Sequence, residues 1–182
     1  MLFTDFKSFT QATEQMSAEE LVDLLDLCYR KFDEIIAKNG IEKIKTIGDA
    51  YMCAAGLPDE KTTHAIDMVR AGIEMQEAMK EINEGQAEKD LPELLMRVGI
   101  HSGPVVAGVV GSIKFAYDIW GDTVNIAARM ESSGAVGEVN ISATTYELVK
   151  NMVSCQHRGK LKAKNKGELD MYFVEQAANK RP

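Results

Sequence analysis

Two tight-turn signals, each flanked by strand-like segments, are the feature that most constrains how this chain folds. Gly48-Asp49 separates two short strand-like segments, and Ser102-Gly103-Pro104 separates two more. Glycine, proline and aspartate at such positions are typical of turns that return the chain beside the strand just completed. We therefore predict two β-hairpins, and with them a mainly antiparallel sheet, from strands at residues 41–46 and 50–54 and at 94–101 and 105–110.

Two long helical patterns lie beside these hairpins. The first spans residues 17–40, where Ser17 and Glu20 form a capping-box signature and Gly40 is a typical stop. A second stripe of apolar residues recurs at helical spacing from Ile66 to Ile82. The other predicted elements are a loop at 84–92, helices at 123–132 and 143–151, and strands at 1–6, 115–120, 139–141, 153–162 and 169–175. This irregular order predicts an α+β fold in which helices flank the sheet.

Composition narrows the classes of protein that remain. With 182 residues and 45% hydrophobic content, the chain fits one globular domain. Its net charge of −7 argues against a broad nucleic-acid surface, and no apolar run reaches the roughly 20 residues that span a bilayer. Three cysteines without metal-site spacing indicate reduced thiols and a cytoplasmic domain. A strand so near the first residue suggests a longer protein, with a regulatory domain or membrane anchor upstream.

Two aspartates at predicted strand ends are candidate metal ligands. Asp5 precedes a polar turn at residues 7–10, and Asp49 lies at the tip of the first hairpin. Carboxylates on adjacent strand ends can hold Mg²⁺, which prefers oxygen ligands and accepts substrate phosphates as co-ligands. The turn after Asp5 could offer backbone N–H groups to phosphate oxygens. Each aspartate is also a common turn former, so the pattern alone leaves both interpretations open.

Other polar residues are candidate phosphate contacts. Asn125 and Arg129 share a face of one predicted helix, which suits a phosphoryl transition state and equally suits a solvated surface. No Walker loop accompanies them, because its Gly-Lys-Ser/Thr ending is absent. A basic tract near the C-terminus can bind a triphosphate or protect a sheet edge, and its alternating lysines are Lys160, Lys162, Lys164 and Lys166.

Ordered local strings resemble the class III nucleotide cyclases. The chain contains FTDFKSFT at 3–10, KIKTIGDAYM at 43–52, RVGIHSG at 97–103 and YDIWGDTVNIAARM at 117–130, which match successive motifs of that family. The resemblance continues to about Val174. It implies the class III cyclase architecture, with its ferredoxin-like palm, in a catalytic domain at 1–176 that is followed by a C-terminal tail at 177–182.

The resemblance implies a two-metal site that holds the nucleotide's phosphates. Asp5 and Asp49 would be the carboxylate ligands of two Mg²⁺ or Mn²⁺ ions, with Phe6 as a further ligand. The phosphate contacts would come from Arg97, Lys164 and the residues Phe6, Lys7, Ser8, Phe9 and Thr10. Lys162 and Lys166 flank Lys164, which leaves open which of these lysines meets the terminal phosphates.

The resemblance also implies roles at the ribose and the purine. Asn125 and Arg129 would position the ribose and stabilise the transition state, and Lys45 and Asp118 would read the base. A lysine donates and an aspartate accepts, which complements adenine, whereas the guanylyl enzymes of the family carry Glu and Cys at these places. Because an unmatched buried polar group discriminates strongly, we expect ATP as the substrate.

The expected activity is that of an adenylyl cyclase, which forms 3′,5′-cyclic AMP and pyrophosphate. The family implies a head-to-tail homodimer whose sites are shared between chains, and this chain carries both sets of site residues. One chain would give Asp5, Asp49 and Arg97, and the other would give Lys45, Asp118, Asn125, Arg129 and Lys164. The alternatives are a guanylyl cyclase and a catalytically silent, nucleotide-binding regulatory domain.

Overall fold

A seven-stranded sheet with the order β2-β3-β1-β4-β7-β9-β8 organises the molecule. The computed structural model describes residues 1–7, 9–111, 116–163 and 167–175. The sheet strands are β1 (Leu2–Lys7), β2 (Glu42–Ile47), β3 (Ala50–Ala54), β4 (Leu95–Ile100), β7 (Val139–Ser142), β8 (Cys155–Ala163) and β9 (Gly167–Val174). Of its neighbouring pairs, only β4 and β7 run parallel. The predicted α+β class with a mainly antiparallel sheet is confirmed.

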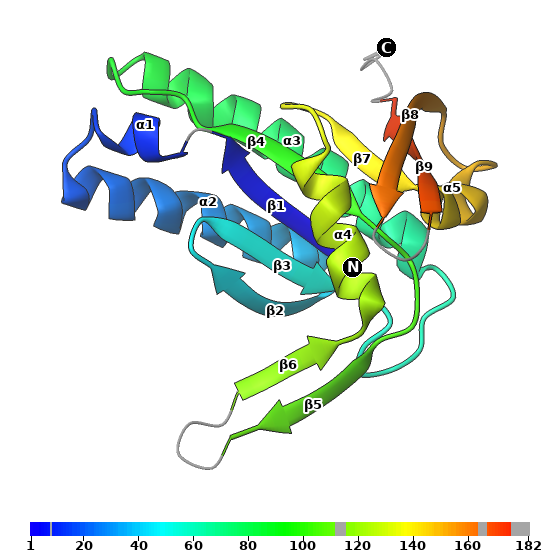
Figure 1. The fold of residues 1–182 in the computed structure, drawn as a ribbon. Helices are drawn as coiled ribbons and strands as arrows, with labels where there is room; N and C mark the ends of the chain where they lie inside the picture. Colours follow the sequence, from blue (N-terminus) through cyan, green and yellow to red (C-terminus); the bar gives the residue numbers. More distant parts are fainter. Residues whose placement is uncertain (8, 112–115, 164–166, 176–182) are drawn as a thin grey trace.

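Helices cover both faces of this sheet, but unequally (Figure 1). The long helices α2 (Ala18–Asn39) and α3 (His64–Ala87) pack on one face, and α5 (Ala143–Val149) packs beside α3. Helix α4 (Asp122–Ser132) crosses the opposite face, and the short helix α1 (Phe9–Thr13) follows β1. No helix in these described ranges is long and apolar enough to cross a membrane.

Alternation along β1 assigns its side chains to the two faces. Leu2 and Phe6 are buried in the large core beneath α2 and α3. Phe3 belongs to a second cluster, which includes Met52 of β3 and Ala127 of α4. Because successive strand residues point to opposite faces, Asp5 shares the α4 face with Phe3.

The predicted termini of helix α2 are confirmed at the level of individual hydrogen bonds. The Ser17 hydroxyl accepts a bond from the Glu20 backbone N–H, and the Glu20 carboxylate accepts one from the Ser17 N–H at 2.8 Å. Gly40 ends the helix in the left-handed conformation, with φ 63°. The caps satisfy backbone groups that would otherwise lack partners, and Gly40 then directs the chain into β2.

The second predicted hairpin is wrong. Strand β4 pairs with β1 along one edge and with β7 along the other, so neither edge is available to β5 (Val106–Val110). Strand β5 instead pairs with β6 (Ala116–Trp120) in a separate two-stranded sheet that projects from the domain (Figure 1). Gly103 allows the backbone to lie close to the side chain of Thr123, since a Cβ at this position would be 2.6 Å from Thr123 Oγ1.

Two smaller expectations also differ from the structure. Helix α3 continues to Ala87, through the start of the loop predicted at 84–92. The side chain of Asn83 exchanges hydrogen bonds with the N–H and C=O of Leu94, which ties this last part of the helix to the segment that leads into β4. The polar segment after β1 contains helix α1 where a turn was expected. The tail predicted at 177–182 lies outside the described residues.

Candidate active site

Asp5 and Arg97 form the centre of the candidate site on the α4 face. They are direct cross-strand partners in the β1–β4 pair, so the sheet register itself places their side chains together. Arg97 Nη2 donates to Asp5 Oδ2 at 2.7 Å. Both side chains are partly accessible, with 29% of Asp5 and 21% of Arg97 exposed. The pair is therefore held by the fold yet open to a ligand.

Asp49 approaches the same place from the β2–β3 turn. The β1–β3 register pairs Phe3 with Met52 and Thr4 with Tyr51, and its continuation brings Asp49 opposite Phe6. Burial raises the pKa of the Asp49 carboxyl above its usual range, and the nearby Asp5 charge adds to the increase. Hydrogen bonds from backbone N–H groups, including that of Phe6, oppose this shift. The Asp5 and Asp49 carboxylates are therefore close enough for their charges to interact.

Tyr29 of helix α2 anchors the turn that carries Asp49. Its hydroxyl donates to the carbonyl of Gly48 at 3.2 Å. Burial raises the pKa of Tyr29 to about 12, with Asp49 and Asp5 contributing, so the phenol remains a donor at neutral pH. Gly48 itself has φ 61°, a conformation that favours glycine and allows the tight turn.

Glu131 belongs to the same group of charges, although the sequence did not indicate it. Its Oε1 atom lies 2.8 Å from Arg97 Nε, so Arg97 bridges Glu131 and Asp5. Only 10% of the Glu131 side chain is exposed. Burial raises the pKa of Glu131 to about 7, against the opposing effect of Arg97. In the sequence, a glutamate near the end of an amphipathic helix is expected to be exposed to solvent. The sequence therefore gave no indication that Glu131 belongs to the site.

Lys45 and Asp118 form an ion pair between the sheet and the projecting hairpin. Lys45 Nζ donates to Asp118 Oδ2 at 2.5 Å, and this contact holds the pKa of the Asp118 carboxyl below its usual range. The two residues come from β2 and β6, which are 73 positions apart in the chain. The structure therefore brings together the two residues predicted to read the purine.

A β-bulge directs Lys45 toward this partner. Lys43 pairs with Cys53, but Lys45 pairs with Met52, so one extra residue is accommodated in β2 between them. Cys53 lies in the core under α2, whereas Met52 lies in the cluster under α4. The two lysines therefore point to opposite faces although they are two residues apart. Lys43 accordingly pairs with Asp33 of α2.

Asn125 and Arg129 lie on the outer side of helix α4. Asn125 is exposed and Arg129 is half-buried. Among the described residues, neither side chain makes a hydrogen bond or ion pair within the chain. Their position leaves both free to contact a ligand or a second molecule.

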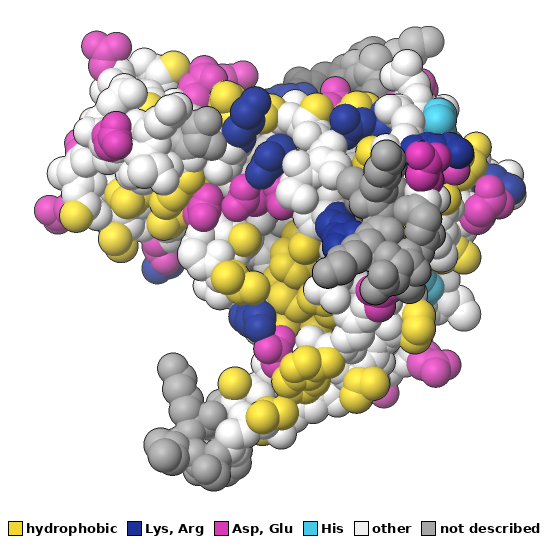
Figure 2. All heavy atoms as spheres, in the orientation of Figure 1, with side chains coloured by type: hydrophobic (Ala, Val, Ile, Leu, Met, Phe, Trp, Pro, Cys, Tyr) yellow, Lys and Arg dark blue, Asp and Glu magenta, His cyan; other side chains and the backbone are white. Residues whose placement is uncertain are grey.

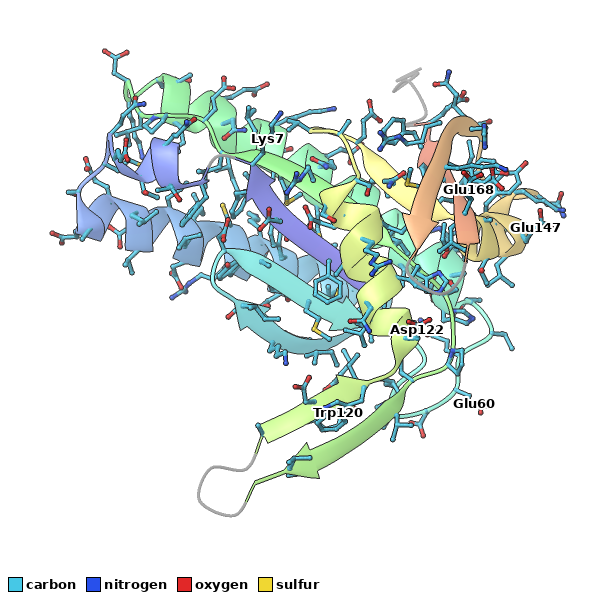
Figure 3. The ribbon with its side chains drawn as sticks, in the orientation of Figure 1. Lys7, Glu60, Trp120, Asp122, Glu147 and Glu168 are labelled. Carbon is cyan, nitrogen blue, oxygen red and sulfur yellow. The ribbon has the colours of Figure 1, made fainter. Side chains whose placement is uncertain are left out.

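The remaining predicted contacts are only partly described. Phe6 is buried, Lys7 and Thr10 are exposed, and Phe9 is half-buried against the core. Lys7 lies at the end of β1, on the side away from the hairpin that carries Trp120 (Figure 3). Ser8 and Lys164 lie outside the described residues, as does Lys166.

Nearly the whole chain matches one family model. Residues 1–176 match the adenylate and guanylate cyclase catalytic domain. The chain belongs to the class III nucleotide cyclases. An adenylate cyclase of Mycobacterium tuberculosis is 36% identical over 174 residues, and a membrane guanylyl cyclase of Dictyostelium discoideum is 37% identical over 180 residues.

The structural comparison agrees with this membership. The crystal structure of the adenylyl cyclase CyaB from P. aeruginosa has a TM-score of 0.91 at 30% identity, and the match covers 98% of this chain and 93% of that one. The two sequence relatives match over 96% and 97% of this chain, but the matched regions are only 38% and 12% of their own lengths. This chain therefore corresponds to the catalytic part of longer cyclases.

The residues of this cyclase domain fit the divalent cations on which its family generally depends. Among the residues that the structure describes, no cluster of three or more His, Cys, Asp or Glu side chains suits a metal. Two carboxylates with a partly open approach are sufficient for Mg²⁺, which takes its other ligands from phosphates and water. Burial is the main cause of the raised pKa of the Asp49 carboxyl, and the nearby Asp5 charge adds to the increase. A bound cation would favour the charged form of both carboxylates. Asp5 and Asp49 are the residues whose side chains would hold these ions, and Phe6, whose side chain is buried in the core, would contribute its main-chain carbonyl.

Several hollows in the described part of the domain lie away from the candidate site. One of about 1040 Å³ lies near the far end of the sheet and is lined by residues that include Ile73, Phe173 and Val174. The candidate site instead lies on the exposed α4 face, where acidic and basic side chains surround an apolar floor (Figure 2).

Proposed function

We propose that this cyclase domain converts ATP into 3′,5′-cyclic AMP and pyrophosphate at sites shared between two copies of the chain. The Lys45–Asp118 pair is the observation that carries the choice of ATP. A donor and an acceptor side by side complement the ring nitrogen and the amino group of adenine. The relative that is named as an adenylate cyclase also supports this choice.

In the proposed reaction, the ribose 3′-hydroxyl gives its proton to water or to the substrate, and its oxygen attacks the α-phosphorus in line with the leaving pyrophosphate. Bound divalent cations would supply Lewis-acid chemistry, lowering the pKa of the 3′-hydroxyl and neutralising phosphate charge. Arg97 would bind the triphosphate beside Asp5, and Asn125 would orient the ribose. Arg129 would face the charge that develops on the α-phosphate. The protein contributes mainly through positioning and fixed charge.

The β5–β6 hairpin supports a second copy of the chain as the partner. It presents a set of exposed apolar side chains, which are Val106 (70% exposed), Val109 (61%), Val110 (59%), Trp120 (43%) and Tyr117 (37%). Exposed apolar clusters of this kind usually mark an interface. Asn125 and Arg129, which have no partner within the described chain, would then complete the partner's site.

The decisive experiment is to incubate the purified protein with ATP or GTP, in Mg²⁺ or Mn²⁺, and to identify any cyclic product by mass spectrometry. Cyclic AMP as the main product is the expected result. Mainly cyclic GMP would establish the guanylyl alternative, to which the Dictyostelium relative's name lends support. Nucleotide binding without any cyclic product would identify a silent regulatory domain and overturn the proposal.

A further inference from the structure

Arg97 is held at both ends of its guanidinium group by acidic side chains. Nη2 contacts Asp5 at 2.7 Å, and Nε lies 2.8 Å from Glu131. The proposed function gives these two acidic residues different roles. Asp5 would become a metal ligand, and its oxygens would then be shared with a cation, whereas Glu131 has no such second role.

The fold places Glu131 beside Arg97 through a close approach of α4 to β4. Arg97 and Gly99 are two residues apart on β4 and therefore share the α4 face. A Cβ on Gly99 would lie 1.9 Å from the backbone nitrogen of Glu131, so only glycine allows this contact. Asn140 of β7 also fixes this end of α4, because its side-chain amide donates to the Met130 carbonyl at 2.7 Å.

The burial of Glu131 is hard to explain by stability alone. Its carboxylate is almost enclosed, and burial disfavours its charged form. Buried ion pairs often contribute little net stability, since the desolvation cost offsets the attraction. Even so, Glu131 Oε1 lies 2.8 Å from Arg97 Nε, and the Arg97 charge opposes the increase in the pKa of Glu131, so the two groups interact directly. A requirement to orient Arg97 accounts for these features.

We propose that Glu131 is a positioning residue that holds the Nε side of Arg97, so that its Nη groups face the triphosphate of the bound nucleotide. The inference rests on the proposed function, in which Arg97 contacts the triphosphate. When Asp5 is engaged by a cation, Glu131 is the carboxylate that remains to orient the guanidinium group. Glu131 thus acts through Arg97 and does not touch the substrate.

A binding experiment that does not require turnover tests this role. The dissociation constant of inorganic tripolyphosphate, in the presence of Mg²⁺, is measured by calorimetry for the unchanged protein, Glu131→Gln, Arg97→Ala and the double variant. We expect Glu131→Gln to weaken binding about tenfold, because a displaced Arg97 guanidinium group would lose most of its attraction to the phosphates. The double variant should bind no more weakly than Arg97→Ala, because Glu131 acts only through Arg97.

Asp67→Asn is the matched control. Asp67 is a carboxylate on α3 with 10% of its side chain exposed, and it pairs with Lys61 at 2.7 Å, so its burial and ion pairing resemble those of Glu131. This variant should lower thermal stability without changing tripolyphosphate binding. Glu131→Asp keeps the charge and should recover part of the affinity that Glu131→Gln loses, which separates positioning from a folding defect.

The outcomes distinguish the inference from the function on which it rests. Unchanged binding in Glu131→Gln, or additive losses in the double variant, would overturn the positioning role while leaving Arg97 as a phosphate contact. Unchanged binding in Arg97→Ala would overturn the proposed function of Arg97 itself. In assays of cyclase activity, Glu131→Gln should raise KM for the nucleotide more than it lowers kcat, whereas a purely structural defect would reduce the amount of active protein and leave KM unchanged.

Discussion

The central strands β1 and β4 and the β5–β6 hairpin differ in how the rest of the molecule supports them. Asp5 and Arg97 lie on β1 and β4, which each have strands on both sides and helices on both faces. Asp118 lies on a two-stranded sheet that carries many exposed apolar side chains. The groups proposed to bind metal and phosphate thus have a rigid support. Asp118, one of the two groups proposed to read the base, lies on an element whose exposed surface a second molecule would cover.

The strongest test of this contrast is Asp5→Asn. If the central strands carry the metal chemistry, removing one ligand charge should reduce kcat by about 10³-fold or more, because metal catalysis contributes several kcal/mol of transition-state stabilisation. The circular dichroism spectrum and melting temperature should be nearly unchanged, since the side chain is partly exposed. Asp23→Asn, at an exposed position on α2, is the control and should retain activity. Near-normal turnover in Asp5→Asn would refute the metal role.

A second test concerns the base-reading pair. Lys45→Glu combined with Asp118→Cys should lower the ATP-to-GTP ratio of kcat/KM by about 10²-fold or more, because the hydrogen-bonding pattern then matches guanine. The ratio is obtained from initial rates with each nucleotide. Lys43→Glu is the control: the bulge turns Lys43 to the opposite face, where it pairs with Asp33, so the ratio should not change. An unchanged ratio in the double variant would count against the purine assignment.

This bulge marks one limit of what the sequence predicts. The hairpin at Gly48-Asp49 and the caps of α2 follow from local chemistry, and both are confirmed. The face on which Lys45 lies depends on one extra residue in β2, and nothing in the composition of that strand signals it. The family motif singled out Lys45 without giving its orientation. Local rules predicted the elements here, while the structure supplied the direction of a side chain.

Long-range pairing marks the other limit. The Ser102-Gly103-Pro104 turn signal predicted the wrong hairpin, because local residues do not reveal that β1 and β7 already occupy both edges of β4. Glu131 was missed for a related reason, since its partner Arg97 is distant in sequence and the contact depends on Gly99.

Mixing two inactive variants tests whether the metal-binding carboxylates and helix α4 come from different chains at each site. Asp49→Ala damages the metal half, and Arg129→Ala damages the helix α4 half. After co-refolding in equal amounts, about a quarter of the unchanged activity should return, because half of the dimers are mixed and each has one intact site. The control mixes Asp49→Ala with Asp5→Asn, which affect the same half and should show no recovery. Absence of recovery in the first mixture would refute the shared site.

The smallest expected effect concerns the surface of the hairpin. Val109→Ser changes a side chain that is 61% exposed and paired with Tyr117 across the two strands, so the stability of the single chain should change by only about 0.5 kcal/mol or less. The dimer should nevertheless dissociate more readily, and the specific activity should fall several-fold in dilute protein and recover as the concentration rises. Val22→Ser is matched in exposure, at 63%, but lies on α2 and should affect neither property. Sedimentation velocity and activity over a dilution series measure both effects.

If the hairpin does not contact a second copy, Val109→Ser will show the same concentration dependence as the unchanged protein. The contrast between the two regions would then need an explanation within one chain.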